Sequence, residues 1–359
     1  MSIDVFKKYY SEEKEKLNQK ISEFNDYFVL GDDGNEYLKE NLEYFRILNS
    51  DGKLIRGTLV NLGYYLLKDN KEYSNDLALA YEVFQTAILV HDDVIDHDTI
   101  RRGKDTIHYA NYKAYNKYSD NSEELTDLSN SIAICMGDYG LYSANKIISN
   151  AYANDKNLAK LLNYFNDTVL NTIKGELLDV ILPFNSRNRV LSKQLLTDSI
   201  MDIYRLKTAY YTVIGPLSVG LILADASEDK IKEVAEFAEK VGIAFQIQDD
   251  ILGIYSNEMG KVIGSDIKEF KQTVLYAYVY GTKYQDELLK YYGQNKLGDE
   301  TIQRVREILE SSGALKYSIS IMNKYFDEAS EILDNISWIS LDKKMILEGF
   351  VEYLRERNK

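Results

Sequence analysis

An apolar helix that ends in acidic residues is the most informative stretch of the chain: residues 77–96 read LALAYEVFQTAILVHDDVID. Apolar residues recur in it at helical spacing, among them Leu77, Tyr81, Phe84 and Ile88. The same spacing recurs along almost the whole chain, whereas the alternating pattern of a half-buried strand is hard to find. The sequence therefore predicts an all-α fold.

The scarcity of proline supports this prediction. Only two prolines occur in 359 residues, and a chain of stacked helices has few places that tolerate a missing backbone amide. We expect one domain, residues 1–359, built as a bundle of ten or more helices around a cavity. The polar breaks between these helices are expected around residues 31–35, 49–52, 118–123, 185–188, 256–265 and 293–299.

The charge balance limits the partners of the protein. Its 57 acidic and 43 basic residues give a net charge of −14 without a basic stripe, which argues against a nucleic-acid or anionic-membrane partner. The longest uncharged run, residues 208–224, is shorter than the ~20 apolar residues of a membrane span, so we expect a buried helix bent at Pro216. A lone cysteine, Cys135, and a charged N-terminal start favour a cytoplasmic protein without disulfides.

The acidic end of the first helix predicts a cation site. Asp92 and Asp96 stand one helical turn apart, so both carboxylates can point at one spot. Like charges at that distance repel each other unless a cation lies between them. A solvated, charged helix end is the alternative in a chain this acidic.

A second acidic pair, Asp249 and Asp250, follows another apolar helical stretch and precedes the glycine-punctuated residues 260–266. Two such pairs predict facing walls of one cavity. Oxygen ligands without a cysteine or histidine set select Mg²⁺, which leaves coordination positions for water and phosphate. A polyphosphate ligand is therefore expected.

Basic residues beside the breaks and the acidic pairs are the expected phosphate contacts, since arginine binds phosphate oxygens bidentately and lysine acts as a point charge. They are Lys53, Arg56, Arg101, Arg102, Lys207, Lys261 and Lys271.

With these motifs in this order, the sequence resembles the trans-type isoprenyl diphosphate synthases of the polyprenyl synthetase family, and most of all a geranylgeranyl diphosphate synthase. The resemblance runs from about residue 52 to residue 271. It rests on GKLIR at 52–56, DDVID at 92–96 with RRG at 101–103, GELLD at 175–179, KT at 207–208, FQIQDD at 245–250, and GK at 260–261 with Asp266 and Lys271.

The resemblance implies a homodimeric, Mg²⁺-dependent prenyltransferase that condenses isopentenyl diphosphate with an allylic diphosphate, with three metal ions when substrate is bound. It implies Mg²⁺ binding by Asp92 and Asp96, supported by Asp93, and by Asp249, aided by Asp250 and Asp266. The implied contacts of the allylic diphosphate are Arg101, Lys207, Lys261 and Lys271. Those of isopentenyl diphosphate are Lys53, Arg56, Gln85 and Arg102, and Thr208 and Gln246 would lie near the reacting carbons.

Four positions depart from the family pattern. Asp51 replaces a glycine before Gly52, Gly57 replaces a common proline, and Glu176 stands where glutamine is frequent. Gly253 replaces the third aspartate of the second motif, which puts the role of that carboxylate in question.

The product length depends on the helix that carries Asp92, along which the growing chain is expected to run. Ala87 and Ile88 lack the aromatic rings that short-product members often place there, and Phe84 and Tyr81 lie deeper. One helical turn advances ~5.4 Å, roughly one isoprene unit, so a floor at Phe84 favours C20 over C15. Farnesyl or longer products stay open, as does simple core packing of both rings.

Three other functions would use parts of this sequence. A terpene cyclase would not need the basic residues of an isopentenyl site. An HD-type phosphohydrolase would use the His91-Asp92 and His97-Asp98 pairs, but no histidine precedes His91 to complete its site. A non-catalytic partner subunit should have lost motif residues, whereas the first aspartate motif is intact.

Overall fold

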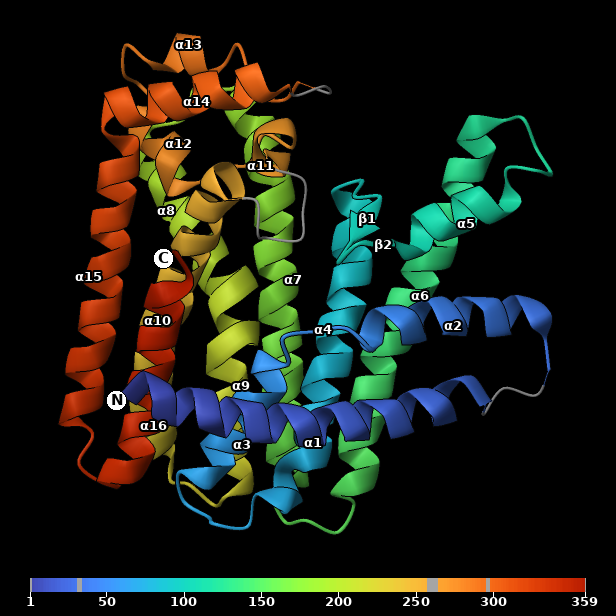
Figure 1. Cartoon of the computed structure of the whole chain (residues 1–359), viewed down its shortest axis with the longest axis vertical. Helices are drawn as coiled ribbons and strands as arrows, with labels where there is room; N and C mark the ends of the chain where they lie inside the picture. The colour runs from blue at the N-terminus through green and yellow to red at the C-terminus, as the bar shows by residue number, and fades with distance from the viewer. Residues whose placement is uncertain (1, 31–33, 257–263, 295–297, 359) are drawn as a thin grey trace. The chain divides into compact units, whose positions relative to one another are not determined.

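The computed structural model describes residues 2–30, 34–256, 264–294 and 298–358, and most of them are helical (Figure 1). The predicted all-α fold of ten or more helices is confirmed among these residues. The chain divides into two compact units: unit 1 contains Met1–Lys7, Asn163–Ser218 and Ala226–Lys359, and unit 2 contains Lys8–Leu162 and Val219–Asp225. Three helices contribute residues to both units: α1 (Ser2–Leu30), α7 (Leu158–Asn188) and α9 (Gly215–Leu223).

The other elements of unit 2 are α2 (Glu36–Asn49), α3 (Ile55–Tyr65), η1 (Lys71–Ser74), α4 (Asn75–Ile95), β1 (Ile100–Arg101), β2 (Lys104–Asp105), α5 (Ile107–Tyr115) and α6 (Ser122–Ala151). The centre of this unit is α4, which packs against α6 and α3 (Figure 1). Gly140 permits the close approach of α6, because a Cβ atom there would lie 2.9 Å from the Cβ of Ala87. The helix ends before His97, whose left-handed φ of 56° breaks the helical path.

The other elements of unit 1 are α8 (Lys193–Ile203), η2 (Tyr204–Ile214), α10 (Glu228–Tyr255), α11 (Ser265–Lys268), α12 (Val274–Val279), α13 (Gln285–Leu288), α14 (Asp299–Ser312), α15 (Ala314–Asn335), α16 (Leu341–Arg355) and η3 (Glu356–Asn358). Here α10 is central and packs against α15 and η2. Gly242 of α10 lies against Ala209 of η2, where a Cβ atom would be only 2.5 Å from the alanine Cβ.

The predicted buried helix in residues 208–224 is present, but its first part is a π-helix, which was not predicted. Gly215 donates its N–H to the carbonyl of Tyr210, five residues earlier, and Pro216 then has no N–H to donate. The segment Lys193–Leu223 is long and apolar enough to cross a membrane, yet 78% of its most apolar window is buried in the structure. It is a core segment of the fold.

Two details differ from the sequence predictions. The two-residue strands β1 and β2 form an antiparallel hairpin that has too few residues to show a strand pattern. The break expected at residues 185–188 is wrong, because these residues form the last turn of α7. Their polar side chains bond back to the helix, as Asn188 Nδ2 does to the Phe184 carbonyl at 2.8 Å.

Candidate active site

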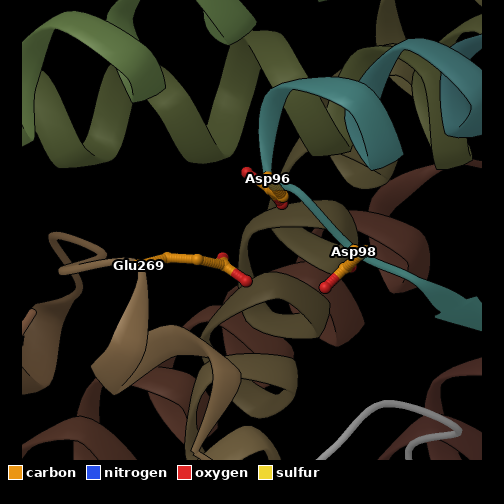
Figure 2. Close-up of side chains that lie close together, drawn as sticks. All are labelled: Asp96, Asp98 and Glu269. Atoms are coloured by element: carbon orange, nitrogen blue, oxygen red, sulfur yellow. The ribbon is translucent and has the colours of Figure 1, made fainter. Parts of the chain in front are cut away.

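The first acidic motif forms a compact turn around one arginine. Asp92 lies in the last turn of α4, and its carbonyl accepts the Asp96 N–H at 2.8 Å, which confirms the predicted spacing of one turn. Arg101 donates from Nε to Asp93 Oδ1 at 2.7 Å and from Nη2 to Asp92 Oδ2 at 3.0 Å and Asp98 Oδ2 at 3.2 Å. The carboxylates of Asp96 and Asp98 approach within 4.8 Å of each other (Figure 2).

Burial sets the electrostatics of this turn. It raises the pKa of Asp93 to about 7, against the opposite effect of the Arg101 guanidinium, because the side chain is almost completely buried. Burial alone would lower the pKa of Arg101, but the three neighbouring carboxylates outweigh it and raise that pKa. Carboxylate oxygens are the donors that a hard divalent cation such as Mg²⁺ takes, and an ion bound here would share them with the Arg101 guanidinium.

Arg101 and Arg102 serve opposite sides of a tight hairpin. Arg102 (φ 54°) and Gly103 (φ 75°) are both left-handed, as the two central residues of a type I′ turn require. While Arg101 faces the carboxylates, Arg102 Nη1 lies 3.5 Å from the position of a Cβ atom on Gly52. The glycine therefore leaves room for the second guanidinium.

The other residues assigned to isopentenyl diphosphate lie in the loop before α3, on α3 and on α4, and Arg56 is close enough to Arg102 for their charges to repel each other. Arg56 lies buried in the first turn of α3, Lys53 is exposed, and Gln85 is half-buried on α4. The departure at Asp51 has a structural reason: its carboxylate pairs with Lys104 at 2.6 Å and ties this loop to the hairpin.

In unit 1, the second acidic motif lies on α10, two turns before the end of the helix. Asp249 pairs with Arg357 of η3 at 3.0 Å, and this guanidinium also lies 4.8 Å from the centre of the Phe245 ring. Asp250 is buried and accepts hydrogen bonds from the Tyr204 hydroxyl and from Gln246 Nε2, the latter at 2.7 Å. Burial raises the pKa of Asp250 well above its usual range, and the charge of Asp266 adds to this.

The same network reaches the π-helix η2. Gln246 accepts a hydrogen bond from the Thr208 hydroxyl, so the two residues expected near the reacting carbons do contact each other. Lys207 pairs with Glu176 at 2.9 Å and Asp179 at 2.7 Å. Both carboxylates lie on α7. Gly175 of the same helix contacts the backbone of Lys207, since a Cβ atom on Gly175 would be 2.2 Å from the backbone nitrogen of Lys207.

Another carboxylate lies beside Gly253, which stands where the family has its third aspartate. A Cβ atom on Gly253 would lie 2.7 Å from Asp266 Oδ2, so the Asp266 carboxylate occupies the space of a side chain at position 253. Lys271 pairs with Glu269 at 3.2 Å. Lys261 lies outside the described residues.

The residues assigned to product length line one side of α4. Phe84 and Tyr81 are fully buried and meet edge to face with their ring centres 6.1 Å apart. Ala87 is also fully buried, and Ile88 is half-buried. Their burial fits both the predicted floor and the alternative of core packing.

Three residues that interact with the predicted site residues were not predicted from the sequence. Arg357 is a single basic residue about a hundred positions from Asp249, and Tyr204 is one of 30 tyrosines. Glu82 is buried on α4 in the middle of an apolar run. Of these three residues, only Glu82 has a local sequence signal, because a glutamate is unusual among apolar helical positions.

Comparisons with known proteins find relatives in both sequence and fold. The solved structure of geranylgeranyl pyrophosphate synthase from Corynebacterium glutamicum, complexed with isoprenyl diphosphate and magnesium, matches with a TM-score of 0.86 and 24% identity, over 98% of this chain and 99% of that chain. A geranylgeranyl diphosphate synthase of Saccharolobus solfataricus is 26% identical over the full length of both proteins. A short chain isoprenyl diphosphate synthase of Methanocaldococcus jannaschii is 29% identical over 74% of this chain and 75% of its own.

The all-helical fold is that of the isoprenoid synthases, as the match in fold indicates. A family model for polyprenyl synthetase matches residues 35–310. The chain therefore belongs to the polyprenyl synthetase family and is a prenyltransferase. The predicted family is confirmed, and the cyclase and phosphohydrolase alternatives lose their support.

Proposed function

We propose that this prenyltransferase condenses isopentenyl diphosphate with an allylic diphosphate, head to tail, and that its main product is geranylgeranyl diphosphate. The relatives from S. solfataricus and C. glutamicum are named for that product. The acidic turn of α4 carries the proposal: Asp92 and Asp96 are held one turn apart with a buried guanidinium beside them. The predicted contribution of both aspartate motifs to one cavity remains part of this proposal.

The allylic substrate loses its diphosphate as the C–O bond breaks. Asp92, Asp96 and Asp249 would hold Mg²⁺, three ions in all, which would neutralise the negative charge that develops on the leaving group. Arg101 and Lys207 supply further positive charge, together with Lys261 and Lys271. Thr208 and Gln246 present oxygen atoms to the carbocation, and apolar surroundings exclude water from it.

The second substrate would be bound by three basic residues and one glutamine of unit 2: Lys53, Arg56, Arg102 and Gln85. Its double bond attacks the allylic carbon, a carbon–carbon bond forms, and a proton leaves the new chain. No side chain is needed as the base, because the departing diphosphate accepts that proton. Phe84 and Tyr81 would stop the chain at about C20.

The test is to incubate the purified protein with isopentenyl and farnesyl diphosphates and Mg²⁺, and to measure the chain length of the product by chromatography. Asp92→Ala and Asp249→Ala should each lower the rate by at least about a hundredfold, given the size of electrostatic contributions to such steps. Circular dichroism should show the helical fold intact. Asp120→Ala, at an exposed position, is the control and should retain full activity.

Near-normal activity of either aspartate variant would contradict the metal assignment. A wild-type protein that makes no product alone, and gains activity only with a second synthase, would instead be a partner subunit. A homodimeric assembly and a cytoplasmic location belong to the same proposal, and size-exclusion chromatography with light scattering tests the former.

A further inference from the structure

A buried carboxylate lies next to the basic residues of unit 2. Glu82 of α4 is only 3% exposed, and its Oε1 accepts the N–H of Gly57 at 2.6 Å. Burying a carboxylate is unfavourable unless hydrogen bonds and opposite charges compensate it. The compensation here comes from the first turn of α3 and from two guanidinium groups.

The hydrogen bond to Gly57 replaces a missing helix cap. The N-cap residue of α3 is Leu54, which has a left-handed φ of 52° and no side-chain group to accept the free N–H groups of the first turn. Glu82 supplies that acceptor from another helix, at the positive end of the α3 dipole. Gly57 makes the approach possible, because a Cβ atom there would lie 3.2 Å from Glu82 Cγ and 3.0 Å from the Ala78 carbonyl. A proline at position 57 would have no N–H to donate.

The same carboxylate balances two arginines. Burial raises the pKa of the Glu82 carboxyl group. Arg56 and Arg102 act in the opposite direction, because both stabilise the ionised form of Glu82. Arg102 in turn is stabilised in its charged form by Glu82 and destabilised by burial and by the like charge of Arg56, so that its pKa is lowered. One carboxylate thus offsets part of the charge of two guanidinium groups that repel each other, and an anionic ligand would balance more of it.

We propose that Glu82 is a positioning residue for isopentenyl diphosphate: it fixes the start of α3 and keeps Arg56 and Arg102 together as one diphosphate-binding group. The inference rests on the proposed function, since that function assigns both arginines to this substrate. Glu82 itself does not touch the substrate.

The experiment compares Glu82→Gln with Glu13→Gln. Glu13 is a fully buried glutamate of the same unit that accepts a hydrogen bond from Asn61 Nδ2 at 2.7 Å, and it is a control for loss of a buried charge. Steady-state kinetics give the KM of each substrate, and thermal unfolding monitors the fold. For Glu82→Gln we expect the KM of isopentenyl diphosphate to rise at least about tenfold and that of the allylic substrate to stay within about twofold. Glu13→Gln should change neither KM by more than about twofold.

Glu82→Asp keeps the charge but withdraws it by one methylene group. This variant should raise the KM of isopentenyl diphosphate about threefold. If Glu82→Gln does not fold, Glu82→Asp alone tests the proposed role of Glu82. An unchanged or lower KM of isopentenyl diphosphate in these variants, or an equal rise of KM for both substrates, would overturn the proposed role of Glu82 and leave the proposed function standing. A wild-type protein without condensation activity would overturn the proposed function instead.

Discussion

Replacement of Arg357 by glutamine should tighten metal binding. Its guanidinium pairs with Asp249 at 3.0 Å, and the two side chains are 15% and 22% exposed. If Asp249 is a metal ligand, a divalent cation must compete with this guanidinium. Removing the guanidinium therefore removes a competitor.

The size of the effect follows from the partial burial of the pair. Exposed ion pairs contribute about 0.2–1 kcal/mol, whereas two unit charges 4 Å apart interact by about 4 kcal/mol at an effective dielectric constant of 20. A value of about 1.4 kcal/mol between these limits corresponds to a tenfold change in affinity. We expect Arg357→Gln to bind Mn²⁺, a substitute for Mg²⁺, about tenfold more tightly in the absence of substrate.

Electron paramagnetic resonance of the unbound Mn²⁺ measures this affinity without any turnover. Arg355→Gln is the matched control, because Arg355 belongs to the same C-terminal segment and pairs with Asp327 at 2.6 Å. It should leave Mn²⁺ binding unchanged. The gain should also vanish in Asp249→Asn/Arg357→Gln, since the two residues act on the same ion. Equal or weaker Mn²⁺ binding by Arg357→Gln would refute the reasoning.

Two further substitutions test the site. Phe84→Ala should lengthen the product by about one isoprene unit and destabilise the fold by about 3–5 kcal/mol, as expected for a fully buried ring; a product distribution identical to wild type would show that Phe84 only packs the core. Glu176→Gln should lower the KM of the allylic substrate about two- to fivefold. The Glu176 carboxylate competes with the substrate for Lys207, and its ion pair with the lysine contributes about 0.5–1 kcal/mol. Asp202→Asn, which breaks an exposed pair with Arg205 at 3.0 Å, is the control for the latter, and a raised KM in Glu176→Gln would mean that the glutamate holds the lysine in place.

Features with a periodic pattern were predictable from the sequence. The spacing of Asp92 and Asp96 follows from the 3.6-residue helical repeat, and the carbonyl-to-amide bond between them bears it out. The buried face of α4, with Tyr81 and Phe84, follows from the same repeat. The assignment of the basic residues near Gly52 to a substrate rests on the order of several motifs and stays a prediction.

Features without a local pattern were not predictable. The hairpin at Arg101 has two-residue strands, which are too short for any periodicity. The π-helix packs closely against α10, where Gly242 meets Ala209, and this contact between distant residues has no local sequence signal. The sequence shows only that Gly253 lacks a carboxylate. The structure shows that the Asp266 carboxylate, thirteen residues further along the chain, fills the space of a side chain at position 253.

The tight turn at Arg102 and Gly103 also gives the two consecutive arginines, Arg101 and Arg102, different surroundings. Because Arg101 ends the strand and the left-handed backbone of Arg102 turns the chain directly after it, the first guanidinium meets the aspartates and the second lies beside Gly52. Insertion of a single residue between Ile100 and Arg101 would carry the first arginine into the turn and redirect both side chains, while leaving the composition of the motif almost unchanged. The length of this short connection therefore matters as much to the enzyme as the two arginines that it carries.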